Sequence, residues 1–237
     1  MLSRTLRAGF PLTVVVIFAT MTTSAQPSAC TIKLNQLTVS PELRGFHLGM
    51  TYAQVKARVP QIEFEMTDQF GVAKASIYPG YDRGFDQASF ADVRTISLDL
   101  LDGRLVSFWI GYASTFKWQA LDEFVTGMSK SLKLPAVWPV KRGSRQLTCD
   151  GFTVFASLIA GSPSIRITDE QAQATIATRR EEAVAAEEAM VIGDVRNKTY
   201  YPSDCEAREN IPAPSRVIFK NKDEAEKAGY KLSKDCE

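Results

Sequence analysis

Residues 95–112, TISLDLLDGRLVSFWIGY, constrain the fold more than any other part of the chain, because they predict a β-hairpin. The dipeptide Asp102-Gly103 is the strongest turn signal in the sequence. A two-residue loop would place Leu98 opposite Ser107, whereas a three-residue loop ending at Gly103 pairs Leu98 with Val106. The apolar pattern favours the three-residue loop.

This register divides the hairpin into a core face and an outer face. The core face collects Ile96, Leu98, Val106, Phe108, Ile110 and Tyr112, with Ile96 opposite Phe108. The outer face carries Ser97, Asp99 and Ser107, together with Leu105 and Trp109. A hairpin alone is marginal in water, so further strands and a helical cover must come from the rest of the chain.

The chain begins like a secretory signal peptide, with basic residues at Arg4 and Arg7 and an apolar run over 10–19. We expect cleavage near Gln26, giving a signal peptide over residues 1–26. The apolar run is too short for a membrane anchor, and Pro11 interrupts it. We therefore expect a periplasmic or secreted protein with no integral membrane span after removal of the signal.

Charge and cysteine content agree with export. Without the signal peptide, 26 basic residues face 27 acidic ones, so no global field attracts nucleic acid or anionic lipid. Four cysteines in an exported chain predict two disulfides, and counting alone allows three pairings. Lipidation of Cys30 is an alternative to its disulfide, although the usual aliphatic residue three positions earlier is missing.

The pattern of elements predicts an α+β fold. A capping box of Thr51 with Gln54 starts a helix that Pro60 stops, and an amphipathic stripe predicts a second helix over 118–132. A second hairpin turns at Asp150-Gly151. Further strands are expected at 31–40, 62–66, 73–78 and 164–168. Helix followed by strands thus occurs twice, which raises internal duplication as one interpretation.

The organisation beyond the sheet is simpler. The segment 170–192 is rich in Ala, Glu and Arg without Gly or Pro until position 193, and it predicts a solvated spacer helix. The expected architecture is an antiparallel sheet with two packed helices over 27–169, the spacer helix, and a small disulfide-stapled α/β unit over 193–237.

No catalytic constellation stands out. The single histidine, His47, has no identifiable nucleophile or orienting group, so we assign no catalytic, metal or cofactor site. The loop over 68–91 is rich in aromatic residues and acids, and such a loop on a rigid scaffold suits ligand or protein contact. The candidate binding residues are Tyr78, Tyr81 and Phe85 from this loop, with Trp109 from the hairpin.

The stretch Gly49-Met50-Thr51-Tyr52-Ala53-Gln54-Val55 resembles the start of small outer-membrane assembly lipoproteins of the SmpA/OmlA type. That family shares its architecture of helices on an antiparallel sheet with β-lactamase-inhibitor proteins. The resemblance implies a periplasmic binding or assembly module.

The C-terminal unit resembles the metal-binding domain of Ada-type DNA repair proteins. The resemblance lies in 198–205 (KTYYPSDC), 216–219 (RVIF) and 223–230 (DEAEKAGY), followed by Cys236. Four cysteines hold zinc in that family, and Cys205 and Cys236 match two of them. Tyr201 stands at the methyl-accepting cysteine and Ser233 at another ligand position, so the resemblance implies neither a closed zinc site nor methyl transfer.

The resemblance also implies the disulfide pairing. Ligands of one zinc are neighbours in space, so Cys205 and Cys236 are placed to bond with each other, which small units need for stability. Cys30 then pairs with Cys149 by exclusion.

We therefore expect an exported, non-catalytic binding or envelope-assembly protein whose partner is an unknown protein or small ligand in the cell envelope. One alternative is a secreted hydrolase that uses the loop carboxylates Asp82, Asp86 and Asp92. Another is nucleic-acid binding through the lysines of the C-terminal unit, which the interleaved acids do not favour.

Overall fold

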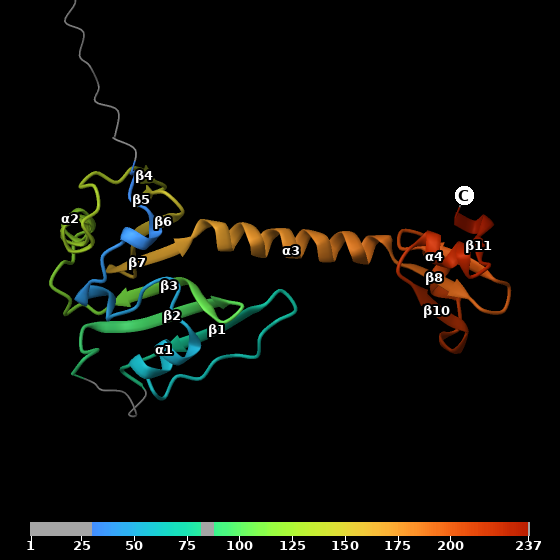
Figure 1. Cartoon of the computed structure of the whole chain (residues 1–237), viewed down its shortest axis with the longest axis horizontal. Helices are drawn as coiled ribbons and strands as arrows, with labels where there is room; N and C mark the ends of the chain where they lie inside the picture. Colours follow the sequence, from blue (N-terminus) through green and yellow to red (C-terminus); the bar gives the residue numbers. More distant parts are fainter. Residues whose placement is uncertain (1–29, 82–87, 237) are drawn as a thin grey trace, which may run out of the picture.

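The computed structural model describes residues 30–81 and 88–236, and it divides them into two folded units joined by a long helix (Figure 1). The expected signal peptide lies outside the described residues. Among those described, no helix is long and apolar enough to cross a bilayer. The fold is α+β, as expected.

The first unit, the α+β domain, is built on a seven-stranded sheet in the order β1-β2-β3-β7-β6-β5-β4. Every neighbouring pair of strands in it is antiparallel. The strands are β1 (Val72–Ile77), β2 (Val93–Leu101), β3 (Arg104–Tyr112), β4 (Val140–Lys141), β5 (Ser144–Thr148), β6 (Phe152–Ile159) and β7 (Ser162–Asp169). The helices are α1 (Tyr52–Arg58) and α2 (Leu121–Leu132).

Both helices contribute to one core with the strands. Thr51 and Gln54 form the expected capping box at the start of α1, whose Val55 is fully buried. Phe124 and Met128 of α2 are buried in the same apolar cluster. The second helix begins at Leu121, three residues later than expected. Trp118 instead precedes it and lies against Gly127, where any side chain would collide with the indole.

The central hairpin differs from the expectation in its turn and in one strand. The loop has two residues, Asp102 and Gly103, both with positive φ (49° and 80°), as a type I′ turn requires. The ladder pairs Leu98 with Phe108, and a β-bulge at Val106 interrupts it between Asp99↔Ser107 and Leu100↔Leu105. The expected three-residue loop is therefore wrong.

The bulge exchanges the faces of two apolar residues. Leu105 is fully buried in the main core. Val106 points to the opposite face of the sheet, where it packs with Ala172 and Ile176 of the helix Glu170–Ala189. The expected placement of Leu105 outside the core and of Val106 inside it is wrong, because one inserted residue reverses the alternation. The other predicted core positions of the hairpin are buried: Ile96, Leu98, Phe108, Ile110 and Tyr112.

Two further expected strands are absent. Residues 62–66 have no regular structure. The segment 31–40 contributes one bridge, Lys33↔Asp150, and two 3₁₀ helices, Leu34–Gln36 and Pro41–Leu43. The expected strands at 73–78 and 164–168 are present as β1 and β7, and the expected hairpin at Asp150-Gly151 is present as β5 and β6.

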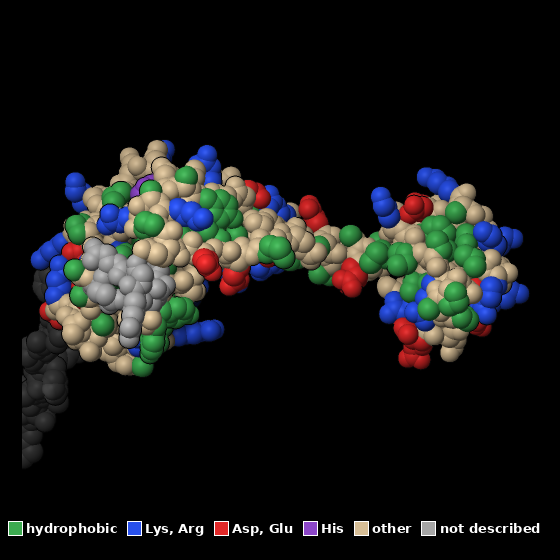
Figure 2. All heavy atoms as spheres, turned by 90° about the horizontal axis from the view of Figure 1, so that it is seen from below, with side chains coloured by type: hydrophobic (Ala, Val, Ile, Leu, Met, Phe, Trp, Pro, Cys, Tyr) green, Lys and Arg blue, Asp and Glu red, His purple; other side chains and the backbone are tan. Residues whose placement is uncertain are grey.

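The spacer is confirmed as α3 (Glu170–Ala189), a helix of 20 residues that leaves the sheet at the end of β7 (Figure 1). Its first turns are anchored to the α+β domain, and its last turn is bonded to the C-terminal unit, since Ser203 Oγ donates to Glu188 O (2.9 Å). Ala172 and Ile176 are buried, and Arg179 donates to both carboxylate oxygens of Asp102 (3.0 and 2.7 Å). Figure 2 shows the middle of α3 as a single solvent-exposed helix between the two units.

The C-terminal unit has a four-stranded sheet in the order β10-β8-β9-β11 covered by one helix. Its elements are β8 (Val191–Asp194), β9 (Thr199–Pro202), β10 (Arg216–Phe219), α4 (Lys222–Lys227) and β11 (Lys231–Leu232), with short 3₁₀ helices at Glu206–Asn210, Ala213–Ser215 and Lys234–Cys236. The unit begins two residues earlier than expected, because β8 starts at Val191. Asn221 caps α4, since its Oδ1 accepts from Glu224 N (3.0 Å).

The two disulfides pair as expected. Cys30 is bonded to Cys149, a separation of 119 residues, and Cys205 is bonded to Cys236, a separation of 31 residues. Each bond therefore lies within one unit, which agrees with the division of the chain by α3.

Candidate ligand-binding cleft

The candidate site lies where the large sheet splits between β3 and β7. The ladder of β3 with β7 ends at Ser107↔Thr168. Beyond that pair β3 has a new neighbour, since Gly49 N donates to Leu105 O (2.7 Å) and Leu105 N donates to Met50 O (2.8 Å). β7 meanwhile continues into α3, so a gap opens between the two strands next to the bulge.

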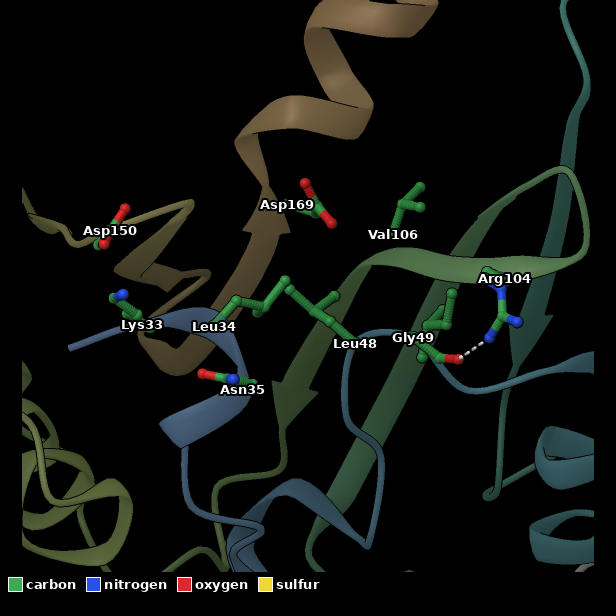
Figure 3. Close-up of a pocket in the computed structure, with 10 residues that line it drawn as sticks. Lys33, Leu34, Asn35, Leu48, Gly49, Arg104, Val106, Asp150 and Asp169 are labelled. Atoms are coloured by element: carbon green, nitrogen blue, oxygen red, sulfur yellow. Dashed lines mark hydrogen bonds between the residues drawn. The ribbon is translucent and has the colours of Figure 1, made fainter.

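This gap is a cleft of about 630 Å³, a volume typical of small-molecule sites (Figure 3). It opens toward solvent, and its walls come from the N-terminal segment, the segment before α1, β3, the β5–β6 turn and the end of β7. The lining residues are Lys33, Leu34, Asn35, Leu48, Gly49, Arg104, Leu105, Val106, Asp150 and Asp169.

The cleft has apolar side chains in its middle and charged groups at its ends. Leu34, Leu48 and Val106 line the middle, where the carboxylate of Asp169 also lies (Figure 3). Lys33 and Asp150 lie at one end and Arg104 at the other. This arrangement suits an elongated ligand that carries polar groups at its ends.

The charged groups differ in how far the protein already uses them. Arg104 donates a long hydrogen bond to Gly49 O (3.4 Å). One oxygen of Asp169 accepts from Ala172 N (2.9 Å) and caps α3. Lys33 and Asp150 are exposed and form no ion pair within the described residues. These two side chains are therefore available to a ligand.

A second cavity of about 200 Å³ adjoins the cleft. The two share Leu34, Asn35 and Leu48, and the second is lined further by the apolar side chains of Leu37, Leu43, Phe46 and Phe108. His47 also lines it, with its Nδ1 3.0 Å from Leu48 O. The 34–35 segment thus lies between the cleft and this second cavity, whose lining includes the polar side chains of Asn35, Thr38 and His47.

A disulfide fixes the wall formed by the N-terminal segment. Cys30 is bonded to Cys149, and Asp150 N donates to Ile32 O (3.0 Å). The backbones of Lys33 and Asp150 also form an isolated parallel β-bridge. These links hold Lys33 and Asp150 beside each other. The disulfide therefore shapes the cleft and does more than prevent fraying of the chain end.

Of the predicted binding residues, the structure describes Tyr78, Tyr81 and Trp109, and none of these three lines the cleft. Tyr78 and Tyr81 are 48% and 89% exposed, just beyond the end of the edge strand β1. Trp109 lies on the face of the sheet opposite the main core, with its indole over Gly111, where a Cβ would come within 2.7 Å of the ring. Phe85 lies outside the described residues.

Trp109 belongs to a row of side chains that crosses six strands on this second face. The ladder pairs give the row Ser76, Ser97, Trp109, Arg166, Phe155 and Gln146. Asp99 stands in the adjacent row, and burial raises its pKa although Lys74 and Arg166 act to lower it. The row is shallow and mainly polar, so the cleft remains the better-defined site.

The loop acids proposed for hydrolysis have structural partners where they are described. Asp92 forms an ion pair with Arg44, and Asp68 accepts from Phe70 N and Val72 N in a turn. Asp82 and Asp86 lie outside the described residues. Within the described ranges, no group of three or more His, Cys, Asp or Glu side chains could hold a metal ion.

The C-terminal unit brings together the four positions that the Ada-type resemblance singles out. Cys205 and Cys236 form the disulfide. Tyr201 is hydrogen-bonded to Thr199 and Ser233, which together lower its pKa. A tyrosine–serine hydrogen bond and a disulfide thus connect these four positions in pairs. Figure 2 shows basic and acidic side chains interspersed over this unit.

Sequence reasoning did not identify the cleft residues. The charged residues of the cleft are far apart in the chain, and only the bulge and the disulfide bring them into one cleft: Lys33, Arg104, Asp150 and Asp169. The one local pattern near the cleft was the pair of Asp-Gly turns, Asp102-Gly103 and Asp150-Gly151, which lie at the same end of the sheet. Comparison with protein-family models, with curated proteins and with solved structures finds no match to this chain.

Proposed function

We propose that the chain is an exported, non-catalytic binding protein of the cell envelope that holds a small or extended ligand in the cleft between β3 and β7. The observation that carries the proposal is that Lys33 and Asp150, which have no ion-pair partner among the described residues, lie at one end of a partly apolar cleft of about 630 Å³. Pockets with an apolar lining and a few convergent polar groups are the usual form of ligand sites.

The preformed walls support binding over a purely structural role. A disulfide and a backbone hydrogen bond of 3.0 Å hold the N-terminal wall before any ligand arrives. Such preorganisation lowers the entropy that binding must overcome. Export accords with both disulfides, which persist in oxidising compartments.

The rest of the chain fits a binding protein with a second, separated module. A 20-residue helix spans ~30 Å, so α3 holds the C-terminal unit at a distance from the cleft. In this proposal the α+β domain binds the ligand, and the C-terminal unit is presented to another component of the envelope.

The proposal is tested with 1-anilinonaphthalene-8-sulfonate, a fluorescent anion with an apolar ring system. We expect saturable binding of one dye per mature chain. Asn35→Trp, which fills the boundary between the two cavities, should abolish it, and Lys33→Glu should weaken it roughly tenfold because it replaces an attracting charge by a repelling one.

The matched control is Lys231→Glu, an exposed reversal of charge in the C-terminal unit, which should leave dye binding unchanged. Thermal unfolding of each variant verifies that the fold is intact. Absence of saturable binding, or equal binding by wild type and Asn35→Trp, would contradict the assignment of the cleft.

A further inference from the structure

Two neighbouring turns form an exposed patch at the end of the sheet farthest from α3. Val140 and Lys141 form β4 and are followed by Arg142 in the β4–β5 turn, and Leu158 and Ile159 end β6 directly before the β6–β7 turn. We call these five residues the tip patch. None of them lines the cleft, which lies at the opposite end of the sheet beside Asp169.

The strand register places the two turns side by side. β5 pairs with β6 through Arg145↔Ala156, and β6 then continues through Leu158 and Ile159 before it turns into β7. The β4–β5 turn, which immediately precedes Arg145, therefore lies next to these two residues.

Both turns are tight and two residues long. Positive φ values occur at Arg142 and Gly143 (50° and 80°) and at Ala160 and Gly161 (51° and 77°). These values are those of type I′ turns, whose backbone is well defined. The patch is thus a pair of short, protruding hairpin tips.

The apolar side chains of the tip patch are exposed to solvent. Val140, Leu158 and Ile159 are 68%, 44% and 42% exposed, although the domain has a large core in which aliphatic residues are buried completely. Leu158 and Ile159 are successive residues of β6 and point to opposite faces of the sheet, so the tip exposes an aliphatic side chain on each face.

Both charged residues of the tip patch are basic. Lys141 and Arg142 are exposed and have no ion-pair partner among the described residues. The segments 139–144 (PVKRGS) and 158–163 (LIAGSP) contain no acid, although the mature chain as a whole is nearly neutral. The cations are therefore concentrated beside the exposed aliphatic groups.

We propose that the tip patch binds the surface of an anionic phospholipid bilayer. Aliphatic side chains on protruding turns enter the boundary between headgroups and acyl chains, while Lys141 and Arg142 approach the lipid phosphates. Two convex tips need no complementary concave surface in a bilayer, whereas a protein partner would have to supply one.

The fold gives this attachment a direction. β7 runs from the tip patch to Asp169 at the other end of the sheet, and α3 continues from there away from the domain (Figure 1). A domain attached through the tip patch would place both the cleft and the C-terminal unit on the side away from the lipid. The part of α3 beyond Arg179, residues 180–189, spans ~15 Å and would hold the C-terminal unit farther out than the domain.

The test is co-sedimentation of the mature, disulfide-bonded chain with two kinds of vesicle, one of phosphatidylcholine and one of phosphatidylcholine and phosphatidylglycerol in equal amounts. We expect binding to the anionic vesicles that weakens as salt is added. Lys141→Glu with Arg142→Glu should lower the partition coefficient by at least roughly fivefold for each charge. Leu158→Ser with Ile159→Ser should lower it roughly tenfold.

Matched control variants carry the same changes elsewhere on the surface. Lys231→Glu with Lys234→Glu reverses two charges of the C-terminal unit, and Ile218→Ser removes an aliphatic side chain that is 70% exposed there. Both controls should retain vesicle binding. All substitutions are at exposed positions, and unchanged thermal unfolding verifies the fold.

Three results would overturn the proposal. They are equal binding to both kinds of vesicle, equal loss of binding in the control variants, and vesicle binding that survives both tip-patch variants. A dimer in solution that Leu158→Ser with Ile159→Ser dissociates, without vesicle binding by the wild type, would assign the patch to self-association instead. Dye binding in the cleft is measured separately, so neither outcome depends on the proposed ligand site.

Discussion

The two folded units of this chain are stabilised in different ways. The α+β domain has a continuous core in which large side chains of the sheet, of α2 and of the segment before α1 are fully buried, among them Phe108, Phe124 and Phe46. The C-terminal unit has a small cluster, Val191, Tyr200, Phe219, Ala225 and Tyr230, next to its disulfide. A small unit exposes much of its surface and depends on a covalent staple, whereas a large domain does not.

The same difference assigns the two disulfides different roles. Cys30–Cys149 joins a chain end to the sheet rim and fixes the wall of the cleft. Cys205–Cys236 closes a loop of 31 residues in a unit with little core. We therefore expect the first bond to matter mainly for ligand binding and the second mainly for folding.

The largest effect is expected in the core of the α+β domain. Leu105→Ala should lower the free energy of unfolding by about 2–5 kcal/mol, as for other fully buried leucines. Val106→Ala should cost only about 1–2 kcal/mol, because Val106 packs in the minor cluster against α3 and loses two methyl groups.

Tryptophan fluorescence during chemical denaturation measures this effect in one unit, since Trp109, Trp118 and Trp138 all lie in the α+β domain. A larger cost for Val106→Ala than for Leu105→Ala would mean that the bulge is absent and that the strand alternates without interruption.

A smaller effect is expected for acid stability, again confined to the α+β domain. Burial raises the pKa of Glu42, but hydrogen bonds from Lys117, Ser131 and Ser40 outweigh it and lower the pKa to about 2. Because the folded-state pKa is below the unfolded one, the stabilisation is present above pH ~4.5 and is lost as the pH falls toward ~2.

Glu42→Gln should therefore remove about 2 kcal/mol of stability at neutral pH and flatten the dependence on pH within that window. Fluorescence-detected unfolding at a series of pH values measures the slope. An unchanged slope in the variant would show that Glu42 does not contribute to the acid response.

The smallest effect concerns the anchor between the domain and α3. Arg179→Ala removes two hydrogen bonds to Asp102 and one to Phe70 O (2.7 Å), all near the surface. We expect little change in the unfolding of either unit, because exposed ion pairs contribute little. Amide hydrogens around residue 179 should nevertheless exchange faster.

The control is Glu181→Ala, two residues further along α3 at an exposed position, and it should not accelerate exchange. Equal acceleration in the two variants would mean that Arg179 has no special part in anchoring the helix.

Local chemistry explains which elements were predictable from the sequence. The capping box at Thr51, the Asp102-Gly103 turn and the Gly-free run of α3 each act within a few residues, and each is present in the structure. The face of Leu105 was not predictable, because a bulge adds one residue without changing the apolar pattern around it.

The cleft was not predictable for a different reason. Its charged ends come from Lys33, Arg104 and Asp150, and no local pattern links them. The N-terminal segment also forms 3₁₀ helices in place of the expected strand. Weak alternation of side chains does not determine whether a segment finds a strand partner.

The most direct test of two differently stabilised units is hydrogen exchange, measured by mass spectrometry, on Cys205→Ser with Cys236→Ser. A loop of 31 residues contributes about 3–4 kcal/mol in the chain-entropy model, which is comparable to the whole stability of so small a unit. We predict that amides of residues 191–236 lose their protection while those of β2, β3, β6 and β7 keep it. Undiminished protection of 191–236, or loss of protection that spreads into the large sheet, would contradict the account.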